Sequence, residues 1–135
     1  IGLTAVCQST LPATTDSPCV IGDQDRLKQV LLNLVSNGIK YNRENGRLTI
    51  AADCDTSQVI LTVTDTGQGI APEDLPHLFE RFYRIPGSEG KAEGSGLGLA
   101  IAEKIVREHN GRLTVSSEVG SGTTFTIELP LASLP

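Results

Sequence analysis

The chain has 135 residues, the length of a single domain, and its 39% hydrophobic content suits a globular fold in water. A formal net charge of −5, with no cluster of Lys or Arg, excludes nonspecific binding to nucleic acid, and no apolar run is long enough to cross a bilayer. The three cysteines lack metal-ligand spacing, so we expect reduced thiols in a cytoplasmic domain. We also expect this domain to contact no membrane and to be monomeric in isolation.

The first half of the chain is predicted to hold strands around one long helix. "GLTAVCQS" indicates a strand, and a short "CVIG" strand follows a turn-rich stretch. Asp23 is a good N-cap for a helix that runs to about Tyr41, where "YNRENG" ends it. "RLTIAA" and "QVILTVTD" then predict a hairpin of strands, because apolar residues alternate in the second of them.

The second half is predicted to hold two more helices and a second pair of strands. Pro72 and the acidic residues after it suit the first turn of a helix that carries "LPHLFERFY". A glycine-bearing loop at residues 84–95 leads to a helix from about Gly96 to His109, and "RLTVSS" and "TTFTIEL" follow as strands. We therefore expect one domain over residues 1–135, an α/β two-layer sandwich whose mixed sheet of about five strands carries three helices on one face.

The first helix carries a narrow polar stripe on a mostly apolar surface. At about 100° per residue, Asn33, Asn37 and Lys40 fall within about 60° of one another. Such a helix is expected to be buried, and unpaired buried amides cost about 1–3 kcal/mol each, so the stripe must face a hydrogen-bond network or a ligand. The ammonium group of Lys40 favours an anion.

Two glycine-rich segments follow the hairpin. In "DTGQGI", Asp65 ends a strand, and Gly67 and Gly69 allow the backbone to approach a flat ligand, although a plain Asp-Gly turn explains this stretch equally well. D-T-G is also the triplet of aspartic proteases, but that alternative requires a mostly β chain, and the helical patterns argue against it. The loop "RIPGSEGKAEGSGLGLA" has neither P-loop nor Rossmann spacing, yet the helix after it offers N–H groups suited to a phosphate.

Taken in order, these motifs resemble the catalytic ATP-binding domain of sensor histidine kinases, in the GHKL or Bergerat-fold family. "QVLLNLVSNGIKYN" is similar to the N-box, "DTGQGI" to the G1 box, "LFERFYR" to the F-box, "GSGLGLAI" to the G2 box and "GSGTTF" to the G3 box. The resemblance covers about residues 20–130. It implies a Bergerat fold that binds ATP and Mg²⁺ and is part of a longer kinase, in keeping with a chain that begins at Ile1 rather than Met.

The resemblance also implies roles for individual positions. Asn33 would supply an oxygen to Mg²⁺, and the catalytic residues would be Asn33, Lys40 and Arg84. Asp65 would accept a hydrogen bond from the adenine amino group. The positions that would contact the nucleotide are Asn37, Tyr41, Asp65, Gly67, Gly69, Ile70, Tyr83, Gly96, Leu97, Gly98, Leu99 and Thr123.

The segment 84–95 resembles an ATP lid that closes over nucleotide, with Phe79 and Phe82 anchoring it by packing. Gln29 stands one turn before Asn33, where hydrolysing relatives have a Glu that activates water. An amide does not take up a proton, so the resemblance implies transfer to a histidine rather than hydrolysis.

The phosphate acceptor of the family, a His followed by an acidic residue, has no match. His77 is followed by Leu, and we interpret it as a partly exposed side chain on a helix. His109 is followed by Asn, and we interpret it as a cation near a helix C-terminus. The resemblance therefore implies an acceptor on a dimerisation helix upstream in the parent chain or on another chain, and a response regulator as a further partner. Two alternatives stay open: a nucleotide-binding interaction module without transfer activity, and a serine-specific anti-sigma-type kinase of the same fold.

Overall fold

A computed structural model of the protein describes residues 4–9, 22–55, 57–83 and 98–131. The elements in chain order are β1 (Thr4–Ser9), α1 (Gln24–Lys40), β2 (Arg47–Cys54), β3 (Gln58–Asp65), the 3₁₀-helix η1 (Leu75–His77), α2 (Gly98–Glu108), β4 (Arg112–Glu118) and β5 (Gly122–Pro130). Residues 19–21 of the predicted short strand and the whole predicted lid, residues 84–95, lie outside the described residues. Within them, no helix is long and apolar enough to cross a bilayer.

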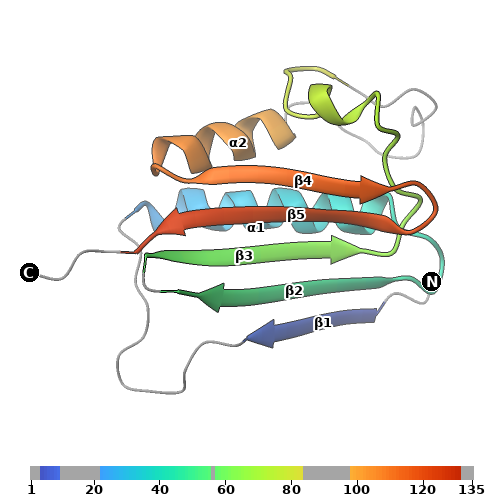
Figure 1. Ribbon diagram of the computed structural model, residues 1–135, viewed down its shortest axis with the longest axis horizontal. Coiled ribbons are helices and arrows are strands. Elements are labelled where there is room, and N and C mark those ends of the chain that lie inside the picture. Colours follow the sequence, from blue (N-terminus) through green and yellow to red (C-terminus); the bar gives the residue numbers. More distant parts are fainter. Residues whose placement is uncertain (1–3, 10–21, 56, 84–97, 132–135) are drawn as a thin grey trace, which may run out of the picture.

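The strands form one sheet in the order β1-β2-β3-β5-β4. The pairs β2–β3, β3–β5 and β5–β4 are antiparallel, while β1 lies at the edge and pairs parallel to β2, so the sheet is mixed. Both α-helices lie on the same side of this sheet (Figure 1) and contact each other. The predicted α/β two-layer arrangement is thereby confirmed.

Helix α1 begins and ends where its capping residues are. The Asp23 carboxylate accepts hydrogen bonds from the N–H groups of Asp25 and Arg26, at 3.0 and 3.2 Å, which satisfies two donors that the helix itself leaves unpaired. At the other end Tyr41 is the C-cap, and Lys40 in the last turn suits the negative end of the helix dipole. The predicted helix from Asp23 to about Tyr41 is confirmed.

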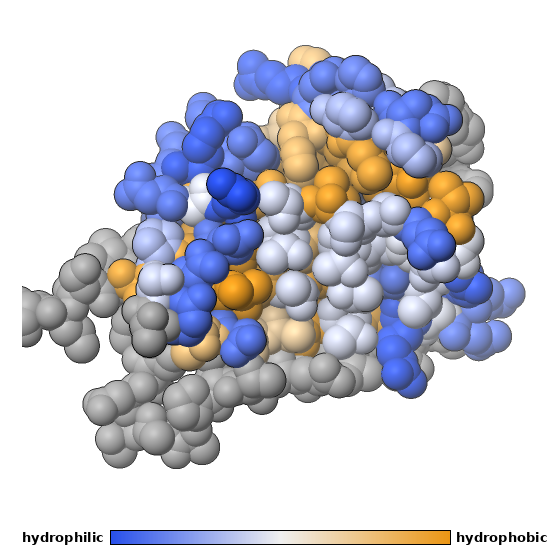
Figure 2. Space-filling view, viewed as in Figure 1, coloured by the Kyte–Doolittle hydropathy of each residue, from blue (hydrophilic) through white to orange (hydrophobic). Residues whose placement is uncertain are grey.

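The two faces of the sheet differ in polarity because side chains alternate along each strand. On the face toward the helices the buried core consists of Val30, Leu34, Leu48, Val63, Ile70, Leu78, Ala102, Ile105, Val106, Leu113, Phe125, Ile127 and Leu129. On the other face, the hydroxyl oxygens of Thr64 and Thr124 lie 3.1 Å apart across β3 and β5. Figure 2 views this uncovered face, where pale, weakly hydrophilic residues occupy the middle.

The third predicted helix is wrong. The segment after Pro72 folds into consecutive tight turns with backbone bonds between residues three apart, of which only Leu75–His77 is a short 3₁₀-helix. An α-helix that begins at Pro72 would place Pro76 in its interior, where proline lacks the N–H group and clashes with the carbonyl one turn earlier. Pro76 is tolerated near the start of η1 instead, so the described residues hold two α-helices rather than three.

The mostly apolar composition of α1 predicts a buried helix, but part of its surface is exposed. Leu32 is 68% exposed and Ile39 is 51% exposed. The sheet and α2 cover the side of α1 that carries Val30 and Leu34, which are almost completely buried. The polar stripe therefore borders an exposed part of the helix surface and is not enclosed within the core.

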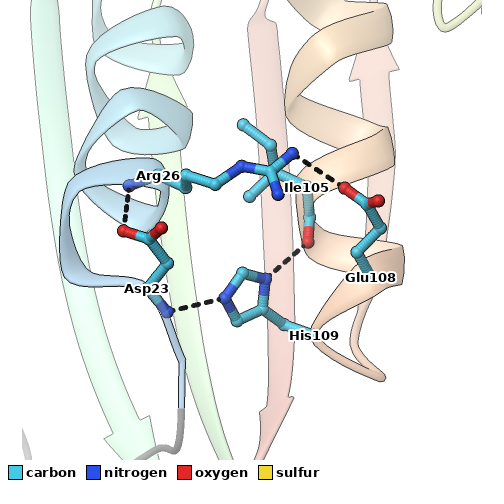
Figure 3. Close-up of polar contacts among 5 residues, drawn as sticks. All are labelled: Asp23, Arg26, Ile105, Glu108 and His109. Atoms are coloured by element: carbon cyan, nitrogen blue, oxygen red, sulfur yellow. Dashed lines mark hydrogen bonds and ion pairs between the residues drawn. The ribbon is translucent and has the colours of Figure 1, made fainter.

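His109 joins the beginning of α1 to the end of α2 (Figure 3). Its Nδ1 donates to the Ile105 carbonyl at 2.7 Å, and its Nε2 accepts from the Asp23 N–H at 3.0 Å. An accepting Nε2 carries no proton, so the imidazole is neutral and the cation predicted at this helix end is wrong. Arg26 and Glu108 form a salt bridge of 2.8 Å beside it.

Candidate functional site

Asp65 ends β3 and is only 8% exposed, on the face of the sheet that meets the helices. Its Oδ1 accepts a hydrogen bond of 2.8 Å from the Gly67 N–H. Burial raises the pKa of Asp65, and the backbone N–H groups of Gly67 and Thr123 act in the opposite direction. The strand thus delivers a buried carboxyl group, held by the turn that follows it.

The two glycines of this turn make room for other parts of the protein backbone. A Cβ on Gly67 would collide with the Tyr41 carbonyl, and a Cβ on Gly69 would collide with the Glu118 carbonyl. Gly69 also has a φ of 77°, which favours glycine. The turn is therefore packed between the end of α1 and the end of β4, and the approach of a flat ligand to these glycines stays a prediction.

Ser117 connects the turn after β3 to β5. Its Oγ accepts from the Ile70 N–H at 2.7 Å and lies 2.8 Å from the Thr123 Oγ1. Ile70 and Thr123 are both buried. The motifs did not identify Ser117, yet strand alternation places it on the same face as Leu113 and Val115, where a polar side chain needs a partner.

Together, the predicted residues Asp65, Gly67, Gly69, Ile70 and Thr123 form a contiguous group at one end of β3 and β5, which we call the Asp65 cluster. Gly120 belongs to the turn between β4 and β5, and its N–H donates to the Gln68 carbonyl at 2.8 Å. This bond holds the turn after β3 against the turn between β4 and β5.

The α1 stripe consists of Asn33, Asn37 and Lys40. The Asn33 amide nitrogen donates to the Gly98 carbonyl at 3.1 Å, which brings the stripe to the first turn of α2. This bond uses the nitrogen, so the amide oxygen is the atom suited to a cation. Asn33 and Asn37 are half-buried and Lys40 is exposed, so the stripe is accessible from one side.

The remaining predicted positions have mixed outcomes. Tyr41 caps α1, and Leu99 packs against the core from the first turn of α2. The Tyr83 ring stacks on His77 at 5.3 Å, and its hydroxyl donates to the buried Asp74 carboxylate, which raises the pKa of Tyr83 to about 12. Tyr83 is thus held within its own segment. The predicted site residues Arg84, Gly96 and Leu97 lie outside the described residues.

The two phenylalanines predicted to anchor the lid by packing behave differently. Phe79 packs on the core and meets Phe125 edge to face at 6.3 Å, as expected of an anchor. Phe82 is 67% exposed and has a positive φ of 66°. Its predicted packing role is wrong, because its ring lies mostly in solvent. Its backbone has the left-handed conformation and ends the run of tight turns.

Comparisons with known proteins agree on one family. The model of the histidine kinase-, DNA gyrase B- and HSP90-like ATPases matches residues 22–133. The sensor histidine kinase RppB of Synechocystis is 45% identical over 115 residues, which cover 84% of this chain and 25% of RppB, so the chain spans a quarter of that relative.

Solved structures lead to the same family. The mycobacterial sensor histidine kinase MprB superimposes with a TM-score of 0.83 at 31% identity, covering 98% of this chain and 86% of that chain. Full-length ShkA in complex with AMPPNP gives a TM-score of 0.82 at 30% identity, covering 98% of this chain and 26% of ShkA.

Proposed function

We propose a function for this chain on the basis of its family. The chain belongs to the histidine kinase-, DNA gyrase B- and HSP90-like ATPases. It binds Mg-ATP and transfers the γ-phosphoryl group to a histidine on a helix outside these residues. The observation that carries this proposal is the buried Asp65 carboxyl group, held by its own turn at one end of the sheet and lying next to Gly38 in the last turn of α1, the helix that carries the α1 stripe.

The Asp65 cluster suits the adenine base. A carboxylate has about four acceptor positions, and the N–H groups of Gly67 and Thr123 use two of them, so Asp65 has capacity for the amino group of adenine. Its burial strengthens such a bond, because water competes less. Thr123 lies beside Asp65 on the neighbouring strand, where its hydroxyl can assist through water.

The α1 stripe suits the phosphates and the metal ion. The Asn33 oxygen is a hard ligand of the kind that Mg²⁺ prefers, and Asn37 and Lys40 follow it along the helix. When bound, Mg²⁺ neutralises charge on the phosphates during phosphoryl transfer. The first turn of α2, at Gly98 and Leu99, offers backbone N–H groups to the same phosphates.

Phosphoryl transfer is favoured over hydrolysis of ATP, because position 29 carries no carboxylate that could activate a water molecule. Gln29, one turn before Asn33, is an amide that takes up no proton. The two histidines are engaged elsewhere: both nitrogens of His109 bond within the helix pair, and His77 bonds to Glu80 at 2.8 Å. Neither histidine is therefore a suitable acceptor of the phosphoryl group.

The other parts of the phosphorelay lie outside this chain. Because the chain spans a quarter of RppB, we propose that a dimerisation helix with the acceptor histidine and a response regulator complete the phosphorelay. By the same resemblance, we assign residues 84–95 to the ATP lid and Arg84 to a catalytic role. These assignments follow from the resemblance of the motifs in this part of the chain.

A transfer assay tests this function. The chain is mixed with a purified acceptor-helix dimer of a sensor kinase and with ATP labelled at the γ-phosphate. We expect acid-labile label on the dimer, as a phosphohistidine gives. Binding of nucleotide without label would favour an interaction module, acid-stable label would favour a serine kinase, and no binding at all would contradict the proposal.

A further inference from the structure

Arg43 lies in the loop after α1 and has no role in any of the motifs that resemble the family. Its guanidinium group contacts three backbone carbonyls: that of Thr66 through Nε, and those of Gly67 and Gly120 through Nη2 at 3.3 and 2.8 Å. These carbonyls come from two separate turns, one after β3 and one between β4 and β5. A single cation therefore joins three parts of the chain around the Asp65 cluster.

One of these contacts acts on Asp65 through a single peptide unit. The Thr66 carbonyl, which accepts from Arg43, and the Gly67 N–H, which donates to the Asp65 Oδ1, belong to the same planar peptide. Fixing the carbonyl end of a planar group fixes the direction of its N–H. A charged donor on the carbonyl also polarises the peptide and strengthens the bond that its N–H makes.

The second turn is fixed by the same side chain. Gly120 accepts from Arg43 with its carbonyl and donates to the Gln68 carbonyl with its N–H. This places the end of β4 against Gly69, whose missing Cβ leaves room for the Glu118 carbonyl. Arg43 thus supports both sides of the turn that holds Asp65.

The loop that carries Arg43 is itself well held. The Asn42 Oδ1 accepts from the Arg43 N–H at 2.9 Å and from the Thr66 hydroxyl at 3.2 Å. The Asn42 amide nitrogen donates to the Arg47 carbonyl at 3.0 Å, and the Arg47 N–H donates to the Thr66 hydroxyl oxygen at 2.7 Å. These bonds fix the backbone from which the Arg43 side chain extends.

We propose that Arg43 is a positioning residue for recognition of the base: it holds the Thr66–Gly67 peptide so that the Asp65 carboxylate is directed to the amino group of adenine. This inference rests on the proposed function. A lysine is a poor replacement, because one ammonium group lacks the planar arrangement of donors that reaches three carbonyls.

The test compares ATP with inosine triphosphate, which carries a carbonyl group in place of the adenine amino group. Dissociation constants for both nucleotides with Mg²⁺ are measured by calorimetry on the unaltered chain, R43M, R43K and the control R112M. Arg112 is exposed on β4 at the far end of the strand from Ser117, so its loss should change neither constant.

We expect R43M to bind ATP about tenfold more weakly while its affinity for inosine triphosphate changes little, so that the preference for ATP falls about tenfold. R43K should be intermediate, and it replaces R43M if that variant fails to fold. Equal weakening of both nucleotides, or an unchanged preference, would overturn the role of Arg43. Absence of nucleotide binding by the unaltered chain would overturn the proposed function itself and this inference with it.

Discussion

The Asp65 cluster and the α1 stripe are built in different ways, although both are assigned to one ligand. At the Asp65 cluster, the side chains of Asp65, Ser117 and Arg43 bond to the backbone of neighbouring turns, at Gly67, Ile70 and Gly120 respectively. In the α1 stripe the side chains project from a rigid helix, and the Asn33 amide nitrogen donates to the Gly98 carbonyl. The proposed base site is therefore arranged before a ligand arrives, while the proposed phosphate site consists of side chains along one face of a helix.

Among the substitutions that test the two regions, Asp65→Asn is expected to have the largest effect on ATP binding. The amide group places a donor where the adenine amino group needs an acceptor, so we expect ATP affinity to fall by about 30-fold to 100-fold. Calorimetry measures the constant, and Glu44→Gln, in the exposed loop after α1, is the control of equal charge change. Unchanged affinity in Asp65→Asn would place the base elsewhere.

The stripe is tested by Asn33→Ala, which removes the proposed oxygen ligand of Mg²⁺. We expect phosphoryl transfer to fall on the order of a hundredfold, because the charge on the phosphates loses its partner. Leu32→Ala is the control, since Leu32 is the adjacent residue and its side chain is mostly exposed. Equal loss in both variants would indicate damage to the helix rather than to a site.

The backbone support of the Asp65 cluster is tested by Ser117→Ala. The buried Ile70 N–H loses its acceptor, so we expect the free energy of unfolding to fall by about 1–2 kcal/mol. Ser116→Ala changes the neighbouring residue on the exposed face of β4 and should alter stability by no more than about 0.5 kcal/mol. Chemical denaturation measures both, and equal values would show that this bond is not needed.

The smallest expected effect is a pH dependence of stability. Because burial raises the pKa of Asp65, the native state holds this proton more tightly than the unfolded state. The contribution of Asp65 to stability is therefore fully present below the unfolded pKa and is lost as the pH rises through the native pKa. We expect the stability of Asp65→Asn relative to the unaltered chain to increase over that rise. A difference that stays constant with pH would contradict the raised pKa.

Local signals in the sequence were sufficient for much of the fold. Asp23 and Tyr41 marked the ends of α1 correctly, because capping is decided within one turn of the helix. Alternation gave the hairpin of β2 and β3, because one face of each strand is buried. The helix expected after Pro72 does not form, because Pro76 would fall in its interior, although the apolar residues around it suit a helix.

The site was predicted where residues close in sequence form a motif and missed where distant segments meet. Asp65, Gly67 and Gly69 were identified from one short stretch. Arg43 meets Gly120 across 77 positions of the chain, and no local pattern indicates that contact. Ser117 could have been found from strand alternation alone, as a polar residue on the buried face.

The most direct measurement of the central claim is a titration of the isotope-labelled chain with Mg-ATP, followed by amide chemical shifts. We predict saturable shifts at the Gly67 and Thr123 backbone amides and at the Asn33 side-chain amide, with a common dissociation constant. Shifts confined to residues remote from Asp65 and from the α1 stripe, or no saturable shifts at all, would contradict the account.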